Sequence, residues 1–542
     1  MRRWNGWGDS TVEYPLPQNG PNLLSALAGS GMPQKDALLE TVLGSVPDSR
    51  LERHPLVSTD PKERLCHARG QSLPDWIALR SGRIAAFPDG VARPMNDDEI
   101  LELIHFAERT GAQLIPYGGG TSVVGHINPL AGDRPVLTVN LRRLNQLEQF
   151  DKQSQLATFG AGVSGPELEA QLRALGFTLG HFPQSFELST LGGWIATRST
   201  GQQSLGYGRI EDLFAGGMVV SPAGVLELLP HPASAAGPDL KQLVLGSEGR
   251  MGIITKATVR TTPLPEKEEF HAVFFPNFEL GKSAVRHMVQ GRLPLSMLRL
   301  STAIETSTML ALAGHERLIN LLEHGLTLRR IGDEKSMLMI GFSGSDNIVK
   351  ASRKEAWSIA RQHKGVVAGQ QFGKQWHKGR FHTPYLRNTL WEQGYALDTL
   401  ETAVPWEDVD GTIEAIENAL RTSLDDTDTK VLVFSHLSHF YPQGASIYTT
   451  YMFGLTPDPD ETLQRWHSLK SAASQAIVKQ KGTISHQHGV GLDHAPYLKY
   501  EKGVLGMEVL ADAMRRFDPQ GIMNPGKLLG RKELTGPDKA SD

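Results

Sequence analysis

Apolar and polar residues follow a helical period in the stretch between Asn96 and Gly111. The apolar positions recur every three to four residues, at Ile100, Leu103, Ile104 and Ala107. This spacing places them on one face of a helix. Asn96 is a good N-cap, Glu99 stands at the position of its reciprocal partner, and Gly111 is a typical stop signal. The pattern therefore predicts an amphipathic helix over residues 97–110.

Short apolar runs of a different kind follow this helix. Residues 135–141 and 156–160 are rich in β-branched and apolar side chains and predict strands. Ser164-Gly165-Pro166-Glu167 is a second capping box and begins a helix that ends at Gly176. Helices and strands alternate in this way through the first 265 residues, which predicts an α+β fold.

A Pro-containing stretch at residues 261–267 predicts a domain boundary. Beyond it, strands at 272–275, 337–342 and 431–434 alternate with helical patterns, and residues 423–430 read as a polar turn. We therefore divide the chain into an irregular, partly helical lead-in (1–80), a first α+β domain (81–265), a second one (266–480), a C-terminal segment (481–530) and a polar tail that we expect to be disordered (531–542).

Composition narrows the class of protein. The net charge of −4 and the lack of a long basic run argue against nucleic acid as a partner. No apolar stretch approaches the ~18 residues that a membrane span needs. Arg2 and Arg3 are followed by no apolar segment, so we expect neither a secretory nor a twin-arginine signal. Cys66 is the only cysteine, which excludes intrachain disulfides and thiolate metal sites. These features favour the cytoplasm.

Three glycine-rich tracts are candidate binding elements. The first, Ile115-Pro116-Tyr117-Gly118-Gly119-Gly120-Thr121-Ser122, lacks the Gly-Lys-Ser/Thr of a Walker loop. The second spans residues 180–212 and the third residues 246–255. Backbone without side chains can pass close to a long polar ligand, such as a dinucleotide with its pyrophosphate. Composition alone leaves open whether the tracts share a ligand or are unrelated turns.

The order and spacing of these tracts resemble the FAD-binding domain of the vanillyl-alcohol oxidase/PCMH superfamily. Within it, the chain is most similar to alkylglycerone-phosphate (alkyldihydroxyacetonephosphate) synthases, from Trp4-Asn5-Gly6-Trp7-Gly8 to Asn524-Pro525-Gly526-Lys527. The resemblance implies a PCMH-type FAD-binding domain of two subdomains, an α+β cap domain that binds the substrate, and a C-terminal segment that returns to the flavin.

The resemblance also implies which residues hold FAD. The pyrophosphate would lie on Pro116, Tyr117, Gly118, Gly119, Gly120, Thr121 and Ser122. The isoalloxazine and ribityl groups would lie along Gln184, Ser185, Phe186, Glu187, Leu188, Ser189, Thr190, Thr197, Arg198, Ser199 and Thr200. The adenine half would be supported by Glu248, Gly249, Arg250, Met251, Gly252, Ile253 and Ile254. Gln184 departs from the aspartate of the synthases. The loop has glycine where covalent members tend to have histidine, so we expect non-covalent FAD.

Five residues in the second half match functional positions of the synthases. Tyr448 matches the general base, although a phenol with a pKa near ~10 needs a neighbouring cation or the flavin to lower that value. His486 and His488 match two of three consecutive histidines, and Gln487 replaces the third. Arg387 matches a phosphate-binding arginine, and Arg299 another functionally sensitive one. Arginines on helices are usually solvated, so only the resemblance singles these two out.

The reaction implied is the exchange of the acyl group of acyl-dihydroxyacetone phosphate for a long-chain alcohol, through an adduct at flavin N5 and without net redox change. One alternative is an FAD-linked oxidase or dehydrogenase of a D-2-hydroxy acid. Such enzymes commonly hold a metal, for which His436, His439 and His488 form a fallback set, although our prediction is that no metal is bound. A second alternative is a flavin-binding protein without catalysis. We further expect a small or lipid-like substrate, peripheral membrane contact and a homodimer.

Overall fold

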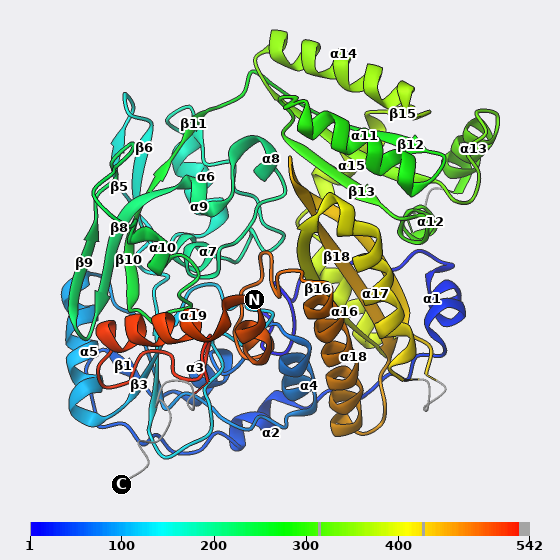
Figure 1. Ribbon diagram of the computed structural model, residues 1–542. Helices are drawn as coiled ribbons and strands as arrows, with labels where there is room; N and C mark the ends of the chain where they lie inside the picture. The colour runs from blue at the N-terminus through cyan, green and yellow to red at the C-terminus, as the bar shows by residue number, and fades with distance from the viewer. Residues whose placement is uncertain (1, 313–315, 425–428, 531–542) are drawn as a thin grey trace.

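The computed structural model describes residues 2–312, 316–424 and 429–530 (Figure 1). Within these ranges the strands form sheets of four, five, two and seven strands. The first three sheets belong to the first half of the chain, at the left of Figure 1, and the seven-stranded sheet lies at the right.

The four-stranded sheet has the order β1-β2-β4-β3. Its strands are β1 (Val57–Ser58), β2 (Gly90–Ala92), β3 (Gln113–Tyr117) and β4 (Val136–Asn140). Helix α5 (Asp97–Thr110) buries its apolar face on this sheet and has the predicted bounds. Asn96 caps it by accepting a hydrogen bond from the Glu99 N–H at 2.9 Å, whereas the Glu99 carboxylate accepts from the Met95 N–H rather than from Asn96.

The antiparallel five-stranded sheet has the order β5-β6-β10-β8-β9. Its strands are β5 (Leu147–Asp151), β6 (Leu156–Gly160), β8 (Phe214–Ser221), β9 (Gly224–Leu228) and β10 (Ile253–Arg260). Helices α6 (Gly165–Arg173) and α7 (Leu191–Thr197) contribute to one hydrophobic core with this sheet. The predicted capping box of Ser164 and Glu167 is present at the start of α6. The short strand β11 (Thr262–Pro263) pairs with β7 (Phe177–Thr178).

The seven-stranded antiparallel sheet has the order β15-β12-β14-β13-β17-β18-β16. Its strands are β12 (Lys267–Phe275), β13 (Met297–Ser301), β14 (Ser336–Gly344), β15 (Val366–Gly369), β16 (Tyr395–Pro405), β17 (Leu432–Tyr441) and β18 (Gly444–Gly454). One face packs against α11 (Phe278–Gln290), α14 (Asp346–Gln362), α17 (Val409–Thr422) and α18 (Pro459–Lys479). Because side chains alternate along a strand, the opposite face presents a second set of residues. Part of that set packs against α12 (Ala303–Leu312), α13 (Glu316–Thr327) and α15 (Gln371–Gly379).

The remaining elements connect these layers. They are α1 (Gly20–Ala28), α2 (Leu39–Gly44), α3 (Pro61–Cys66), α4 (Leu73–Ser81), α8 (Ser204–Tyr207), α9 (Ile210–Leu213), α10 (Lys241–Val244), η1 (Thr383–Tyr385), α16 (Leu386–Glu392), η2 (Trp406–Asp408) and α19 (Ala495–Phe517). The N-terminal segment is held to α16, where Asn388 exchanges two hydrogen bonds of 3.1 Å with the Trp7 backbone.

The C-terminal segment returns to the first half of the chain. Helix α19, red in Figure 1, packs against Met251, and Leu114 of β3 forms a bridge with Met523. In the described ranges, no helix combines the length and the apolar character needed to cross a bilayer. The five-part division of the chain stays a prediction, and its tail at 531–542 and residues 425–428 of the polar turn lie outside the described residues.

Candidate active site

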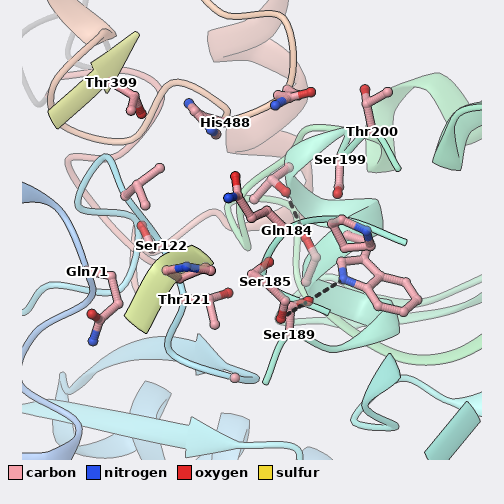
Figure 2. A pocket seen from close by; sticks show the side chains of 18 of the residues that line it. Gln71, Thr121, Ser122, Gln184, Ser185, Ser189, Ser199, Thr200, Thr399 and His488 are labelled. Carbon is pink, nitrogen blue, oxygen red and sulfur yellow. Dashed lines mark hydrogen bonds between the residues drawn. The ribbon is translucent and has the colours of Figure 1, made fainter. Parts of the chain in front are cut away.

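A cavity of about 590 Å³ lies where the glycine-rich tracts of the first half meet the open face of the seven-stranded sheet. Figure 2 shows side chains from several segments around this space: Thr121 and Ser122 from the glycine loop, Gln184 and Ser199 from the second tract, and Thr399 and His488 from the second half. Segments that are far apart in the sequence therefore line one chamber.

The glycine loop is pressed against residues 188–190. A Cβ on Gly119 would lie 2.0 Å from the Leu188 carbonyl oxygen, and one on Gly118 would lie 2.2 Å from Thr190 Oγ1. The sequence analysis explained the glycines by the close approach of a ligand. In the structure, packing against residues 188–190 is by itself enough to require glycine at these two positions. All seven residues from Pro116 to Ser122 line the cavity.

The other two tracts divide between the cavity and the protein interior. The predicted FAD residues that line the cavity are Gln184, Ser185, Ser189, Thr190, Thr197, Ser199, Thr200, Glu248, Gly249, Gly252 and Ile254. Those that do not are Phe186, Glu187, Leu188, Arg198, Arg250, Met251 and Ile253. Several of the latter have structural partners. Phe186 stacks on Phe381, and Arg198 pairs with Glu211 at 3.0 Å.

Glu248 connects its tract to the C-terminal segment. Its carboxylate accepts hydrogen bonds from the N–H groups of Val490 and Gly491, at 2.5 and 2.9 Å, and lies 3.2 Å from His126 Nε2. Asn524 donates to the backbone oxygens of Glu248 and His126 at 2.7 and 3.0 Å. His126 and Asn524 also line the cavity, although the sequence assigned neither of them to the site.

Tyr448 lines the cavity from β18, the strand next to the β16 edge of the seven-stranded sheet. Its direct cross-strand neighbours are Glu401 on β16 and His436 on β17. The phenol donates a hydrogen bond of 3.1 Å to Thr399 Oγ1. Enclosure in the protein raises the pKa of Tyr448 well above its usual value, and the charge of Glu401 raises it further, against an opposing effect of Arg387. The surroundings of Tyr448 thus favour the neutral phenol, contrary to what a general base needs.

His436 lies between Tyr448 and a buried ion pair. Its ring stacks on Tyr448, and its Nδ1 lies 2.9 Å from Glu305 Oε1. Glu305 also accepts from Arg299 at 2.7 Å. Burial raises the pKa of Glu305, but the charges of Arg299 and His436 outweigh it and lower the value to about 2. Arg299 lies on strand β13 rather than on a helix, and it lines the cavity.

The two predicted histidines point to different surroundings. His488 lines the cavity, and its Nδ1 lies 2.7 Å from Glu401 Oε2. His486 does not line it and instead lies 2.6 Å from the Tyr441 hydroxyl and 3.2 Å from Arg209 Nη1. Glu401 is fully buried, and its other oxygen accepts from the N–H groups of Gln487 and His488 at 2.9 and 2.8 Å.

Arg387 reaches the cavity from α16. Its guanidinium lies 4.5 Å from the centre of the Trp76 ring, and Nη1 donates to the Gln71 carbonyl. Nε and Nη2 are buried and make no hydrogen bond within the described residues. A buried unpaired donor costs about 1–3 kcal/mol, so a ligand that accepts hydrogen bonds from these two nitrogens would offset that cost.

The fallback metal set is not assembled. His436 and His488 contact Glu305 and Glu401, and His439 lies 3.2 Å from Ser204 Oγ. Within the part of the chain that the structure describes, no three His, Cys, Asp or Glu side chains are grouped to hold a metal ion.

The cavity is suited to a long polar ligand. Besides Arg387, several of its lining side chains have a buried polar atom without a hydrogen-bond partner among the described residues, including Thr200 Oγ1, Gln202 Oε1, Gln487 Oε1 and Asn524 Oδ1. These atoms extend from the glycine tracts to the C-terminal segment, so a ligand with several donor and acceptor groups would satisfy them. A dinucleotide has that character.

Comparison with known proteins agrees with this geometry. The family described as FAD binding domain matches residues 88–229, and the family described as FAD linked oxidases, C-terminal domain, matches residues 264–528. The alkyldihydroxyacetonephosphate synthase of Dictyostelium discoideum is 31% identical, over 97% of this chain and 93% of that protein. The chain belongs to the alkyldihydroxyacetonephosphate synthase family. FAD is its cofactor.

Other members of the synthase family agree in length and in fold. The Trypanosoma brucei brucei synthase is 28% identical over 97% of this chain and 92% of that protein. A crystal structure of an alkyldihydroxyacetonephosphate synthase superposes with a TM-score of 0.82 and 26% identity, covering 97% of this chain and 98% of that one. The predicted α+β fold, with its FAD-binding domain and separate second domain, is confirmed.

Proposed function

We propose that this protein is an FAD-dependent alkylglycerone-phosphate synthase, which exchanges the acyl group of acyl-dihydroxyacetone phosphate for a long-chain alcohol. The observation that carries the proposal is the single cavity, because Tyr448 and Arg387 line the same chamber as the glycine loop. Family membership supports the same reaction, since the Dictyostelium relative is named for it.

Arg387 is the residue we assign to the substrate phosphate. Its Nε and Nη2 form the edge of a planar fork that matches two phosphate oxygens. The ring of Trp76 and the Gln71 carbonyl already fix the orientation of the guanidinium, so little side-chain freedom remains to be lost on binding.

The alkyl chains would lie along the apolar part of the cavity. This part is lined by Met297, Leu298, Met309, Leu312, Leu386, Leu390, Leu397 and Phe434. At roughly 0.8 kcal/mol for each buried methylene group, such a surface favours long-chain substrates over short hydroxy acids.

Tyr448 is assigned as the group that takes the substrate proton, at its phenolic oxygen. FAD, when bound, supplies the electrophilic ring on which the reaction depends. The positive charge of Arg387 stabilises the phenolate, whereas Glu401 opposes it. Because the surroundings raise the pKa of Tyr448, only the small phenolate fraction can take the proton, and proton removal should become faster as the pH rises. His488, fixed by Glu401 at 2.7 Å, faces Tyr448 with ring centroids 5.7 Å apart and orients the phenol.

Two departures from the synthase pattern line the cavity, Gln184 and Gln487. Gln487 has a buried oxygen without a hydrogen-bond partner in the described structure. A glutamine can donate and accept hydrogen bonds but cannot carry a proton, so we assign Gln487 to binding and not to proton transfer.

The test is to supply the purified holoenzyme with acyl-dihydroxyacetone phosphate and a labelled long-chain alcohol. We expect the label in an ether-linked product. Under anaerobic conditions, D-2-hydroxy acids should leave the flavin spectrum unchanged. Bleaching by a hydroxy acid without ether formation would replace the proposal by the FAD-linked dehydrogenase. No turnover of either substrate class would favour a non-catalytic flavin protein.

Four features stay predictions alongside this activity: non-covalent attachment of FAD, a homodimer, peripheral membrane contact and location in the cytoplasm. Acid or heat treatment that releases the yellow chromophore from denatured protein would support non-covalent FAD. Chromophore retained on the precipitate would contradict it.

A further inference from the structure

A second cavity, of about 160 Å³, adjoins the glycine loop. Tyr117 and Gln71 line both cavities. The ring of His67 packs against that of Tyr117, with centroids 4.5 Å apart, and the Tyr117 hydroxyl donates to the Cys66 carbonyl at 3.4 Å. The second cavity is thus a separate chamber beside the main one, and the reaction proposed above makes no use of it.

Four arginines line this small space: Arg2, Arg3, Arg69 and Arg93. No aspartate or glutamate lines it within the described ranges. Like charges this close repel one another unless an anion lies between them. A bound anion would relieve this repulsion among the four guanidinium groups.

Nearby carboxylates offset only part of this charge. Arg93 pairs with Glu63 at 2.8 Å, and Arg69 Nε lies 4.0 Å from an oxygen of Asp75. Arg2 donates to a neutral acceptor, the Gly119 carbonyl oxygen, at 2.6 Å. Arg3 Nε is buried and has no hydrogen-bond partner in the described structure. An excess of positive charge and one unsatisfied donor remain.

The His67 and Asn140 side chains that line the cavity are uncharged near pH 7 and bonded to each other. Burial lowers the pKa of His67 to about 4, so its ring is uncharged near pH 7. The Glu63 carbonyl lies 2.7 Å from His67 Nδ1 and can only accept, which leaves Nε2 to accept from Asn140 Nδ2 at 2.8 Å. Since both ring nitrogens are already engaged, the donors available to a ligand belong to the arginines.

We propose that this second cavity binds a phosphate dianion, either inorganic phosphate or the phosphate group of a small monoester. Guanidinium groups match phosphate oxygens in geometry and in charge, and the small volume excludes a nucleotide. Through the contact of Arg2 with Gly119, the bound anion would also hold the N-terminal segment against the flavin loop.

Cys66 provides a readout that does not depend on catalysis. It is the only cysteine of the chain, it is exposed, and it lines the second cavity. The holoenzyme is treated with N-ethylmaleimide, which is uncharged, and labelling is followed by mass spectrometry in potassium phosphate or in potassium chloride of equal ionic strength. At a phosphate concentration twice the dissociation constant, one third of the sites are free, so labelling should slow about threefold.

Arginine variants test whether the protection of Cys66 by phosphate arises in the second cavity. Arg3→Gln combined with Arg93→Gln should abolish the protection, while Arg516→Gln, a matched change at an exposed arginine of α19, should keep it. Flavin absorbance and circular dichroism report whether the double variant is folded. If it is not, Arg93→Gln alone, whose side chain is 45% exposed, should still weaken the protection.

The outcomes separate the possible ligands. Protection by both inorganic phosphate and glycerol 3-phosphate supports recognition of the dianion itself, and protection by the ester alone assigns the cavity to a phosphate ester. Equal labelling rates in phosphate and chloride would overturn the proposal. So would protection that persists unchanged in the folded double variant.

Discussion

Tyr448 and His436 stand opposite each other on strands β18 and β17, and their rings stack with centroids 5.0 Å apart and planes 20° apart. His436 is in turn fixed by the buried carboxylate of Glu305. A residue on helix α12 therefore helps to position the proposed base, through the ring of His436.

Replacement of Tyr448 by phenylalanine removes one oxygen and keeps the ring packing. We expect FAD content and the melting temperature to change little, since the lost hydrogen bond to Thr399 contributes about 1 kcal/mol. Proton abstraction should slow by roughly 10²–10⁴-fold, the contribution of a positioned base. Thr399→Val, which removes only the acceptor, is the control and should cost far less activity.

The pH dependence of the wild-type rate tests the same residue. Because the surroundings raise the pKa of Tyr448, the phenolate fraction increases with pH throughout the range in which the protein is stable. The rate of fatty-acid release should continue to rise above pH 8. A plateau that begins near neutral pH would identify a different base.

Arg387→Lys keeps the positive charge but loses the planar guanidinium, which can donate two parallel hydrogen bonds to a phosphate. Binding of phosphorylated substrate should weaken by about 1–3 kcal/mol, seen as a higher KM. Arg83→Lys is the matched control, because the Arg83 side chain is 57% exposed and pairs with Asp458 and Asp460 at the surface. Normal kinetics in Arg387→Lys would place the phosphate elsewhere.

Glu305→Gln removes the negative charge of the Glu305 carboxylate and nearly keeps the size of the side chain. The pKa of Glu305 is lowered from 4.5 to about 2, so its ionised form stabilises the folded protein above about pH 4.5, and this contribution disappears as the pH falls toward 2. The shift corresponds to an upper limit of roughly 3 kcal/mol near pH 7. Urea unfolding should show a large difference between wild type and Glu305→Gln at pH 7 and less than half of that difference near pH 3. A difference that does not depend on pH would rule out the ion pair as its source.

Gly119→Ala tests the packing of the flavin loop. A Cβ there meets the Leu188 carbonyl oxygen at 2.0 Å, and such overpacking costs about 1–3 kcal/mol. The variant should be poor in FAD and less stable. Gly411→Ala, on α17, should be neutral or stabilising, because the new methyl group would meet no other element of the described structure within 4 Å. Full FAD occupancy in Gly119→Ala would mean that the loop can move away from residues 188–190 without cost.

The sequence predicted correctly the helix whose two ends are fixed by capping residues next to it in the chain. Helix α5 has its predicted bounds because Asn96 and Gly111 set them through caps that depend on neighbouring residues alone. Arg299 was placed on a helix, but it lies on β13, where its pairing with Glu305 depends on the tertiary packing of α12.

The site was harder to predict than the fold. His486 and His488 are two residues apart in the sequence, yet only His488 reaches the cavity, because the loop directs His486 toward Tyr441. Glu305 and Glu401 belong to no recognisable sequence motif. Their roles become visible only in the folded chain, where Glu305 contacts His436 and Glu401 contacts His488. The alternation along β16 could have indicated that Glu401 shares a face with Thr399.

The most direct test of the account is to measure fatty-acid release from acyl-dihydroxyacetone phosphate by the holoenzyme, with oxygen uptake and dye reduction followed in the same sample. The account predicts release without consumption of oxygen or dye, and almost none from Tyr448→Phe with full FAD content. Absence of fatty-acid release, together with dye reduction by a D-2-hydroxy acid, would contradict it.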